Sequence, residues 1–194
     1  LEGICHIYVD REVDLDKSLD VIINSKMRRT GICGAAETLL IDKKLQNDKI
    51  FKIISELQKF NCEIRGDEFI KNISNDITLA SEEDWSTEYL DAIISVKLVG
   101  GVKEAVCHIN HYSSQHTETI LTENEATADY FLKNVDSAIV MKNASTQFAD
   151  GGEFGMGAEI GISTGRLHAR GPVGANQLTS FKYIVKGNGQ IRPN

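Results

Sequence analysis

Cys33 has the sequence surroundings of a nucleophile. It lies between two periodic stretches, with Gly31 and Gly34 beside it and with Arg28 and Arg29 five and four residues before it. A cysteine near fixed positive charge has a lowered pKa, and its thiolate is the reactive form. Small neighbours let a substrate approach the sulfur. The alternative is a buried, inert cysteine, which is the commoner fate of a free thiol.

Cys107 and three histidines have spacing that suits a metal site. On a helix over 102–109, His108 and His111 would share a face, and with His116 they could hold zinc. His116 lies beyond the end of that helix, however. We therefore favour a solvated helix end over a metal site, and no metal is predicted.

The glycine-rich stretch 143–164 shows little periodicity and predicts a loop. Gly155, Gly157 and Gly161 are too widely spaced for the dinucleotide-binding fingerprint, because that pattern requires a glycine where this chain has Ile160. A dinucleotide site in this stretch is therefore not expected.

The composition indicates a soluble globular domain of 194 residues with a formal charge of −7. The negative charge argues against a nucleic-acid partner and against an anionic membrane surface. No run of about eighteen apolar residues exists, so no membrane span is expected. Widely spaced cysteines are typical of a reducing compartment, here the cytoplasm: Cys5, Cys33, Cys62 and Cys107. Because Leu1 stands where a strand begins, we expect a fragment that lacks its amino-terminal part.

Alternating strand and helix patterns predict an α/β fold with a mostly parallel sheet and helices on both faces. The β-rich runs are 4–9, 37–41, 62–65, 89–99, 118–122, 137–141 and 181–185. Helical stripes are predicted over 15–27, from 47 or 48 to about 60, from 102 to at least 109, and after a capping box at 122–125. Asp14 can cap the first helix, and residues 69–79 are expected to be irregular.

Five segments resemble the γ-glutamyl phosphate reductase (glutamate-5-semialdehyde dehydrogenase) family, a branch of the aldehyde dehydrogenase superfamily. They are GICHIYVD (3–10), CGAAETLL (33–40), DWSTEYLD (84–91), DGGEFGMGAEIGIST (150–164) and HARGPVG (168–174). The last two together are highly specific. The chain departs from the family pattern at Gly34, where asparagine is usual, and at Thr30, where proline is usual.

The resemblance implies an aldehyde dehydrogenase-like catalytic domain that reduces γ-glutamyl phosphate to glutamate 5-semialdehyde with NADPH, in proline biosynthesis. It makes Cys33 the nucleophile that forms a thioester, and it makes Glu88 a contact to the nicotinamide ribose. Arg29 matches a basic position that could steer the acyl phosphate. Ser145 and Thr146 match the superfamily loop that closes over the substrate, so they are expected to bind its α-carboxylate and amino group.

The resemblance also divides the chain into a catalytic domain over 1–178, whose amino-terminal cofactor domain is missing, and an oligomerisation strand and tail over 179–194. Phe181, Tyr183 and Val185 would fall on one face of that strand. Because an unpaired strand tends to pair with another chain, a homo-oligomer is expected. Alternatives remain: an inactive remnant or assembly module, or another thiol-dependent aldehyde dehydrogenase.

Overall fold

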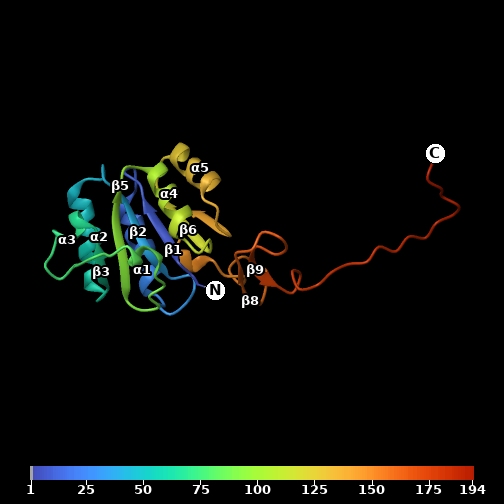
Figure 1. Ribbon diagram of the computed structural model, residues 1–194, viewed down its shortest axis with the longest axis horizontal. Helices are drawn as coiled ribbons and strands as arrows, with labels where there is room; N and C mark the ends of the chain where they lie inside the picture. The colour runs from blue at the N-terminus through green and yellow to red at the C-terminus, as the bar shows by residue number, and fades with distance from the viewer. Residues whose placement is uncertain (1) are drawn as a thin grey trace.

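The central feature is a seven-stranded sheet in which every strand pair is parallel (Figure 1). The computed structural model describes residues 2–194. The strand order is β4-β3-β5-β2-β1-β6-β7. The strands are β1 Cys5–Val9, β2 Ala36–Asp42, β3 Glu63–Gly66, β4 Thr78–Leu79, β5 Ile93–Val99, β6 Thr117–Leu121 and β7 Ile139–Lys142. The predicted α/β fold is confirmed.

Helices cover both faces of this sheet (Figure 1). They are α1 Leu15–Met27, α2 Asn47–Lys59, α3 Glu68–Lys71, α4 Val102–Tyr112 and α5 Glu125–Asn134. Side chains alternate along the central strands, as the pleat requires. Ile7 and Val9 of β1 pack in the core with α1 and α2, whereas Tyr8 packs in the core with α4 and α5. The short α3 and β4 overlap the stretch 69–79, which was expected to be irregular, so that prediction is wrong for these two elements.

The helix starts show which capping signals operate. The Asp14 side chain accepts a hydrogen bond from the Lys17 amide, as predicted for α1. The capping box predicted at 122–125 is wrong, because α5 is capped by Asn124, whose side chain accepts from the Thr127 amide at 3.0 Å. Thr122 instead accepts from the Asn124 amide. The cap therefore lies two residues later than the sequence suggested.

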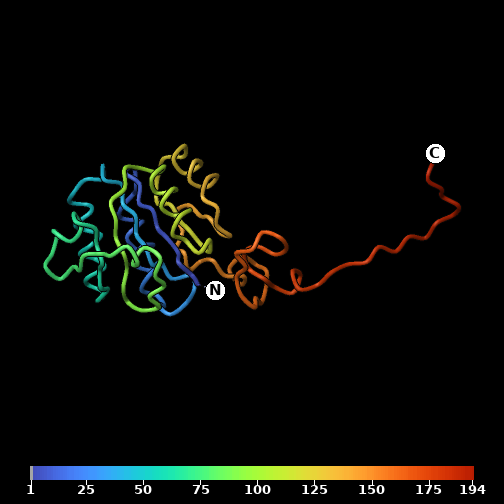
Figure 2. The backbone as a smooth tube through the Cα atoms, viewed as in Figure 1, coloured from blue at the N-terminus to red at the C-terminus, as the bar shows by residue number. Residues whose placement is uncertain are grey.

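The glycine-rich stretch is more ordered than a loop. It contains the 3₁₀ helix η2 Thr146–Phe148, and its strand β8 Glu159–Ser163 pairs antiparallel with β9 Gly171–Gly174. The backbone tube shows this hairpin beside the main body (Figure 2). Glu159 also closes the preceding turn, because its carboxylate accepts from the Gly151 amide at 2.7 Å. The prediction of an irregular loop over 143–164 is thus wrong for β8.

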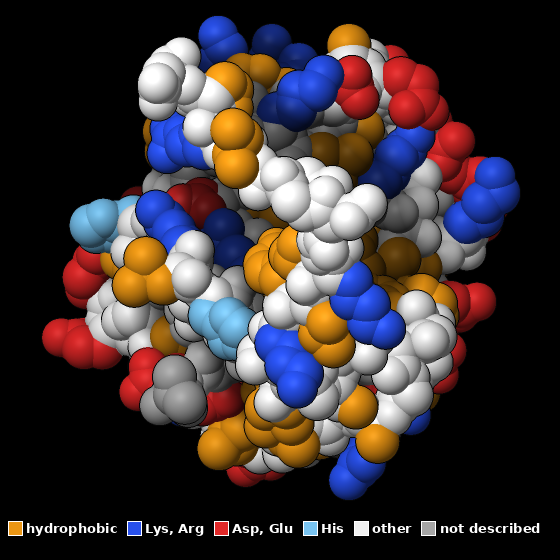
Figure 3. Space-filling view, turned by 90° about the vertical axis from the view of Figure 1, so that its right-hand side faces the viewer, with side chains coloured by type: hydrophobic (Ala, Val, Ile, Leu, Met, Phe, Trp, Pro, Cys, Tyr) orange, Lys and Arg blue, Asp and Glu red, His pale blue; other side chains and the backbone are white. Residues whose placement is uncertain are grey.

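Residues 179–194 extend away from the rest of the chain (Figure 2). No strand is assigned in this segment, and Phe181, Tyr183 and Val185 are at least 80% exposed. The space-filling view from this side shows hydrophobic side chains among lysines and arginines (Figure 3). The strand predicted over 181–185 is not formed in this structure, and pairing of this segment with a second chain stays a prediction. Within the same described residues, none of the helices combines the length and apolar character needed to cross a membrane.

Candidate active site at the amino edge of the sheet

The residues singled out in the sequence meet where the central strands begin. Cys33 precedes β2, Gly3 precedes β1 and Glu88 precedes β5. These three strands are adjacent in the sheet. Because the strands are parallel, the segments that lead into them converge on one edge, which we call the amino edge.

The opposite, carboxyl edge is closed by the chain itself. Open α/β sheets usually bind ligands there, where the strand order reverses, which in this sheet is between β1 and β6. Asp10 and Thr122 fill that position with a 2.9 Å side-chain hydrogen bond, and the Asp10 amide bonds to the Leu121 carbonyl at 3.0 Å. The Tyr8 hydroxyl donates a hydrogen bond to Asp10 Oδ1 at 3.1 Å. The candidate residues Cys33 and Glu88 lie at the amino edge instead.

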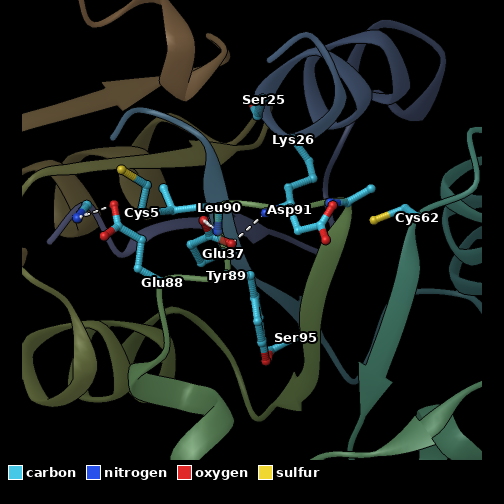
Figure 4. A network of polar contacts seen from close by, with 12 residues as sticks. Cys5, Ser25, Lys26, Glu37, Cys62, Glu88, Tyr89, Leu90, Asp91 and Ser95 are labelled. Carbon is cyan, nitrogen blue, oxygen red and sulfur yellow. Dashed lines mark hydrogen bonds and ion pairs between the residues drawn. The ribbon is translucent and has the colours of Figure 1, made fainter. Parts of the chain in front are cut away.

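Cys33 is held in a tight backbone contact with Gly3. A Cβ atom on Gly3 would lie only 2.2 Å from the Cys33 carbonyl oxygen, so no larger side chain fits without movement. Two hydrogen bonds secure this contact: the Gly3 amide donates to Glu88 Oε1 at 2.8 Å, and the Cys5 thiol donates to the Cys33 carbonyl at 3.1 Å. Glu88 and Cys5 lie on the same side of the close-up view (Figure 4).

The Cys33 thiol is exposed, but it is not activated by the nearby arginines. Partial burial and the Glu159 and Glu88 carboxylates raise its pKa, while the backbone amides of Cys33 and Gly34 lower it. The prediction of a lowered pKa is therefore wrong for this structure. Sequence proximity misled, because partial burial raises the pKa of Cys33 most, and carboxylates from two distant segments raise it further.

Arg28 and Arg29 are both exposed, and both form hydrogen bonds with Gln147 of η2. Arg28 donates to the Gln147 side chain at 3.4 Å, and the Arg29 carbonyl accepts from the Gln147 amide group at 3.1 Å. Arg28 also lines a cavity of about 300 Å³ together with Asn24 and Ser145. Arg28 thus faces this cavity, although the sequence singled out Arg29.

Ser145 and Thr146 differ in accessibility. Ser145 is half-buried and its hydroxyl lies 3.2 Å from that of Ser25. Thr146 is fully buried, and its amide donates to the Ser25 hydroxyl at 3.1 Å. A Cβ on Gly34 would lie 3.4 Å from the Thr146 carbonyl, so η2 packs directly on the nucleophile segment. Their substrate contacts stay predictions, and only Ser145 lines the cavity.

Glu88 is half-buried, and one of its two carboxylate oxygens accepts no hydrogen bond from the described residues. Oε1 accepts from Gly3, whereas no hydrogen bond to Oε2 is formed by residues 2–194. A carboxylate oxygen that accepts no other bond suits a ribose hydroxyl. The geometry therefore fits the ribose contact expected from the resemblance.

The histidines do not assemble with Cys107. His108 is buried against His6 and Trp85, and burial lowers its pKa to about 3. Cys107 and His111 are exposed. Over residues 2–194, no group of three or more potential ligands is close enough to hold a metal ion. The interpretation as a solvated helix end is wrong for His108, which belongs to the packed interior.

Comparison with known proteins agrees with this geometry. No family model matches the chain. γ-Glutamyl phosphate reductase from Parvibaculum lavamentivorans is 59% identical over 193 residues, which are 100% of this chain and 46% of that protein. The Bartonella quintana enzyme is 58% identical over 99% of this chain and 46% of that protein. The resemblance to the γ-glutamyl phosphate reductase family is confirmed. The chain spans about half the length of these curated relatives.

Solved structures show the same fold. The crystal structure of γ-glutamyl phosphate reductase from Thermotoga maritima has a TM-score of 0.96 and 50% identity over 100% of this chain and 47% of that chain. An acetylating aldehyde dehydrogenase from Geobacillus thermoglucosidasius has a TM-score of 0.73 at 18% identity, over 100% of this chain and 52% of that chain. The aldehyde dehydrogenase-like fold expected from the γ-glutamyl phosphate reductase resemblance is confirmed.

Sequence reasoning missed a buried ion pair behind the γ-glutamyl phosphate reductase motif CGAAETLL. Lys26 Nζ lies 2.5 Å from Glu37 Oε2, and both side chains are fully buried. Burial outweighs the attraction of Lys26 and raises the pKa of Glu37 to about 7. The signal was present, because Glu37 is an acidic residue within a stretch that was predicted to be a strand of the sheet.

Proposed function

We propose that this chain is the catalytic part of an enzyme that reduces L-glutamate 5-phosphate to L-glutamate 5-semialdehyde with NADPH, in proline biosynthesis. One observation carries the proposal: an exposed cysteine, Cys33, lies beside Glu88 at the amino edge, within the motif that the chain shares with γ-glutamyl phosphate reductases. The four cysteines are free, in keeping with a cytoplasmic enzyme.

In the proposed reaction the Cys33 thiolate attacks the acyl carbon. A carbon–sulfur bond forms, and phosphate leaves with the electron pair of the carbon–oxygen bond, which gives a thioester. Bound NADPH would supply the hydride that reduces this thioester. The carbon–sulfur bond then breaks, and Cys33 is released as the aldehyde departs. The Cys33 amide is a candidate donor to the oxyanion.

Because the pKa of Cys33 is raised, the thiol form predominates at neutral pH in this chain. Acyl phosphates are activated substrates, so no dedicated base for a water molecule is needed in this direction. The proton of Cys33 must still be removed before attack, and the carboxylate of Glu88 lies near enough to influence it.

Substrate and cofactor contacts are assigned as follows in this proposal. Arg29 steers the phosphate, and Ser145 and Thr146 bind the α-carboxylate and amino group. Glu88 holds the nicotinamide ribose through its free oxygen. The remaining cofactor contacts lie outside the residues of this chain, so the chain alone should not bind NADPH tightly.

We further propose that residues 1–178 form the catalytic domain and that 179–194 join a second copy of the chain. Support comes from Phe181, Tyr183 and Val185, whose apolar side chains are exposed on a segment without a partner among the described residues. Apolar side chains of this kind are usually covered in an assembly. A homo-oligomer through the carboxy-terminal segment follows.

Replacement of Cys33 by alanine tests the function. In a full-length enzyme that contains this chain, Cys33→Ala should abolish semialdehyde formation from γ-glutamyl phosphate. Cys62→Ala and Cys107→Ala are matched controls, because one removes a buried thiol and the other an exposed thiol, and neither is assigned a role in the proposed reaction. Near-normal activity of Cys33→Ala would refute the assignment. An inactive parent enzyme would favour the alternative of an inactive remnant.

A further inference from the structure

Lys26 and Glu37 place two charges in the interior directly behind the nucleophile. Lys26 is the penultimate residue of α1, and Glu37 is the second residue of β2. Removing charges from water is costly, and an apolar pair of similar size often stabilises a fold as well or better. Stability alone therefore does not explain why an ion pair occupies this position. The contacts of the pair suggest that it positions the neighbouring segment.

The second oxygen of Glu37 reaches the segment that carries Glu88. Oε1 accepts from the Leu90 amide at 3.5 Å, and the close-up shows Glu37 between Lys26 and Leu90 (Figure 4). Leu90 has φ 55°, a left-handed conformation that is strained for a bulky side chain. Such strain persists only where the surroundings hold it. The Leu90 side chain is 50% exposed, so packing of that side chain does not supply the restraint.

These contacts close a ring around the amino edge. Cys33 touches Gly3, Gly3 donates to Glu88, and Leu90, two residues further on, donates to Glu37. Glu37 lies four residues after Cys33, as the second residue of β2. Every link is either a short piece of chain or a direct contact. Loss of the contact between Glu37 and Leu90 removes this restraint on the segment that carries Glu88.

Lys26 fixes the direction of the Glu37 carboxylate. It binds Oε2 and leaves Oε1 for Leu90, and its ammonium group lies 5.9 Å from the centre of the Tyr89 ring. Tyr89 is itself anchored, because its hydroxyl bonds to Asp84 at 2.8 Å. The pair therefore joins the end of α1 to both residues that follow Glu88.

We propose that Glu37, oriented by Lys26, is a positioning residue that holds Leu90 and through it sets Glu88 against the Cys33 segment for hydride transfer. The inference rests on the proposed function, because Glu88 matters only if it contacts the cofactor. Glu37 itself is fully buried, so we assign it a role through Leu90 and not a direct contact with substrate or cofactor.

Two double variants separate this role from simple destabilisation. Lys26→Met with Glu37→Gln removes both charges and keeps an acceptor for the Leu90 amide. Lys26→Met with Glu37→Leu removes both charges and the acceptor. In a full-length enzyme, the second variant should have kcat/KM for NADPH about 100-fold below the first, the loss typical of a misplacement of about 1 Å. KM for the acyl phosphate should be unchanged.

Asp42→Asn is the matched control for loss of a buried carboxylate. Asp42 is also fully buried, pairs with Arg11 at 2.8 Å and lies at the other end of β2. This variant should leave kcat/KM for NADPH near the parent value even if it lowers the melting temperature. Equal kcat/KM in the two double variants, or an equal loss in Asp42→Asn, overturns the inference.

Hydrogen exchange provides a readout that does not depend on activity. The Leu90 amide should exchange faster in the Leu double variant than in the Gln double variant. Equal exchange rates overturn the inference even if the parent enzyme is active. If the parent enzyme shows no reductase activity, the proposed function fails, and the exchange rates still decide whether Glu37 holds Leu90.

Discussion

Gly3→Ala perturbs the nucleophile through a single methyl group. The added Cβ would lie 2.2 Å from the Cys33 carbonyl oxygen, whereas ordinary contact begins near 3.4 Å. One of the two backbones must therefore move by about 1.2 Å. Gly3 is tied to Glu88, and Cys33 is tied to Cys5, so movement breaks at least one of these hydrogen bonds.

The size of the effect follows from this displacement. Overpacking of this kind costs roughly 1–3 kcal/mol. A cost of about 2 kcal/mol lowers the melting temperature of a chain of this size by about 4–8 °C. A shift of about 1 Å at the nucleophile should lower turnover by about 100-fold.

Gly31→Ala is the control in the same region. A Cβ on Gly31 would meet only the Leu90 carbonyl, at 3.8 Å, which is an ordinary contact. Thermal unfolding of both variants, followed by semialdehyde formation in the full-length enzyme, gives the comparison. If Gly3→Ala melts and turns over as Gly31→Ala does, the close contact is not a constraint and the reasoning fails.

Three further predictions concern pH, thiol reactivity and assembly. Burial lowers the pKa of His108 to about 3 and of His116 to about 4, below the unfolded value of 6.5, so the folded state binds fewer protons. The free energy of unfolding should therefore decrease as pH falls below about 6.5, measured by urea unfolding at pH 7 and 5; a flat profile would contradict the assignment. Glu88→Gln should speed alkylation of Cys33 by iodoacetamide at pH 8, because a nearby negative charge that raises the pKa of Cys33 is removed; an unchanged or slower rate counts against this electrostatic account. Truncation at Thr179 should leave the melting temperature of the monomer unchanged while sedimentation shows a smaller oligomer; the same oligomer in both proteins rules out assembly through the tail.

Local signals predicted the regular elements well. The stripe in 15–27 and the cap at Asp14 gave α1 with the bounds that the structure shows. The apolar residues after Cys33 predicted β2, which is buried along its whole length although it also contains Glu37, Thr38 and Asp42. The pairing of β8 with β9 was missed, since glycine-rich strands have little alternation to detect.

The electrostatics of the candidate site could not be predicted from local spacing. Arg28 and Arg29 are neighbours of Cys33 in sequence, yet partial burial raises the pKa of Cys33, and the Glu159 and Glu88 carboxylates raise it further. Both carboxylates come from segments far along the chain, and only the parallel sheet brings them together. The Gly3 amide and the Glu88 carboxylate form a hydrogen bond although they are 85 residues apart in the sequence.

The long separation between the parts of the amino edge has a consequence for synthesis on the ribosome. About 55 residues must be added after Cys33 before Glu88 exists, which takes about 3–11 s at typical rates of 5–20 residues per second. Until β5 docks, the Gly3 amide lacks its acceptor and the thiol lacks the environment that raises its pKa. The thiol of the nascent chain is therefore more readily ionised than that of the folded chain, and the environment that raises its pKa is complete only after Glu159 has also been added.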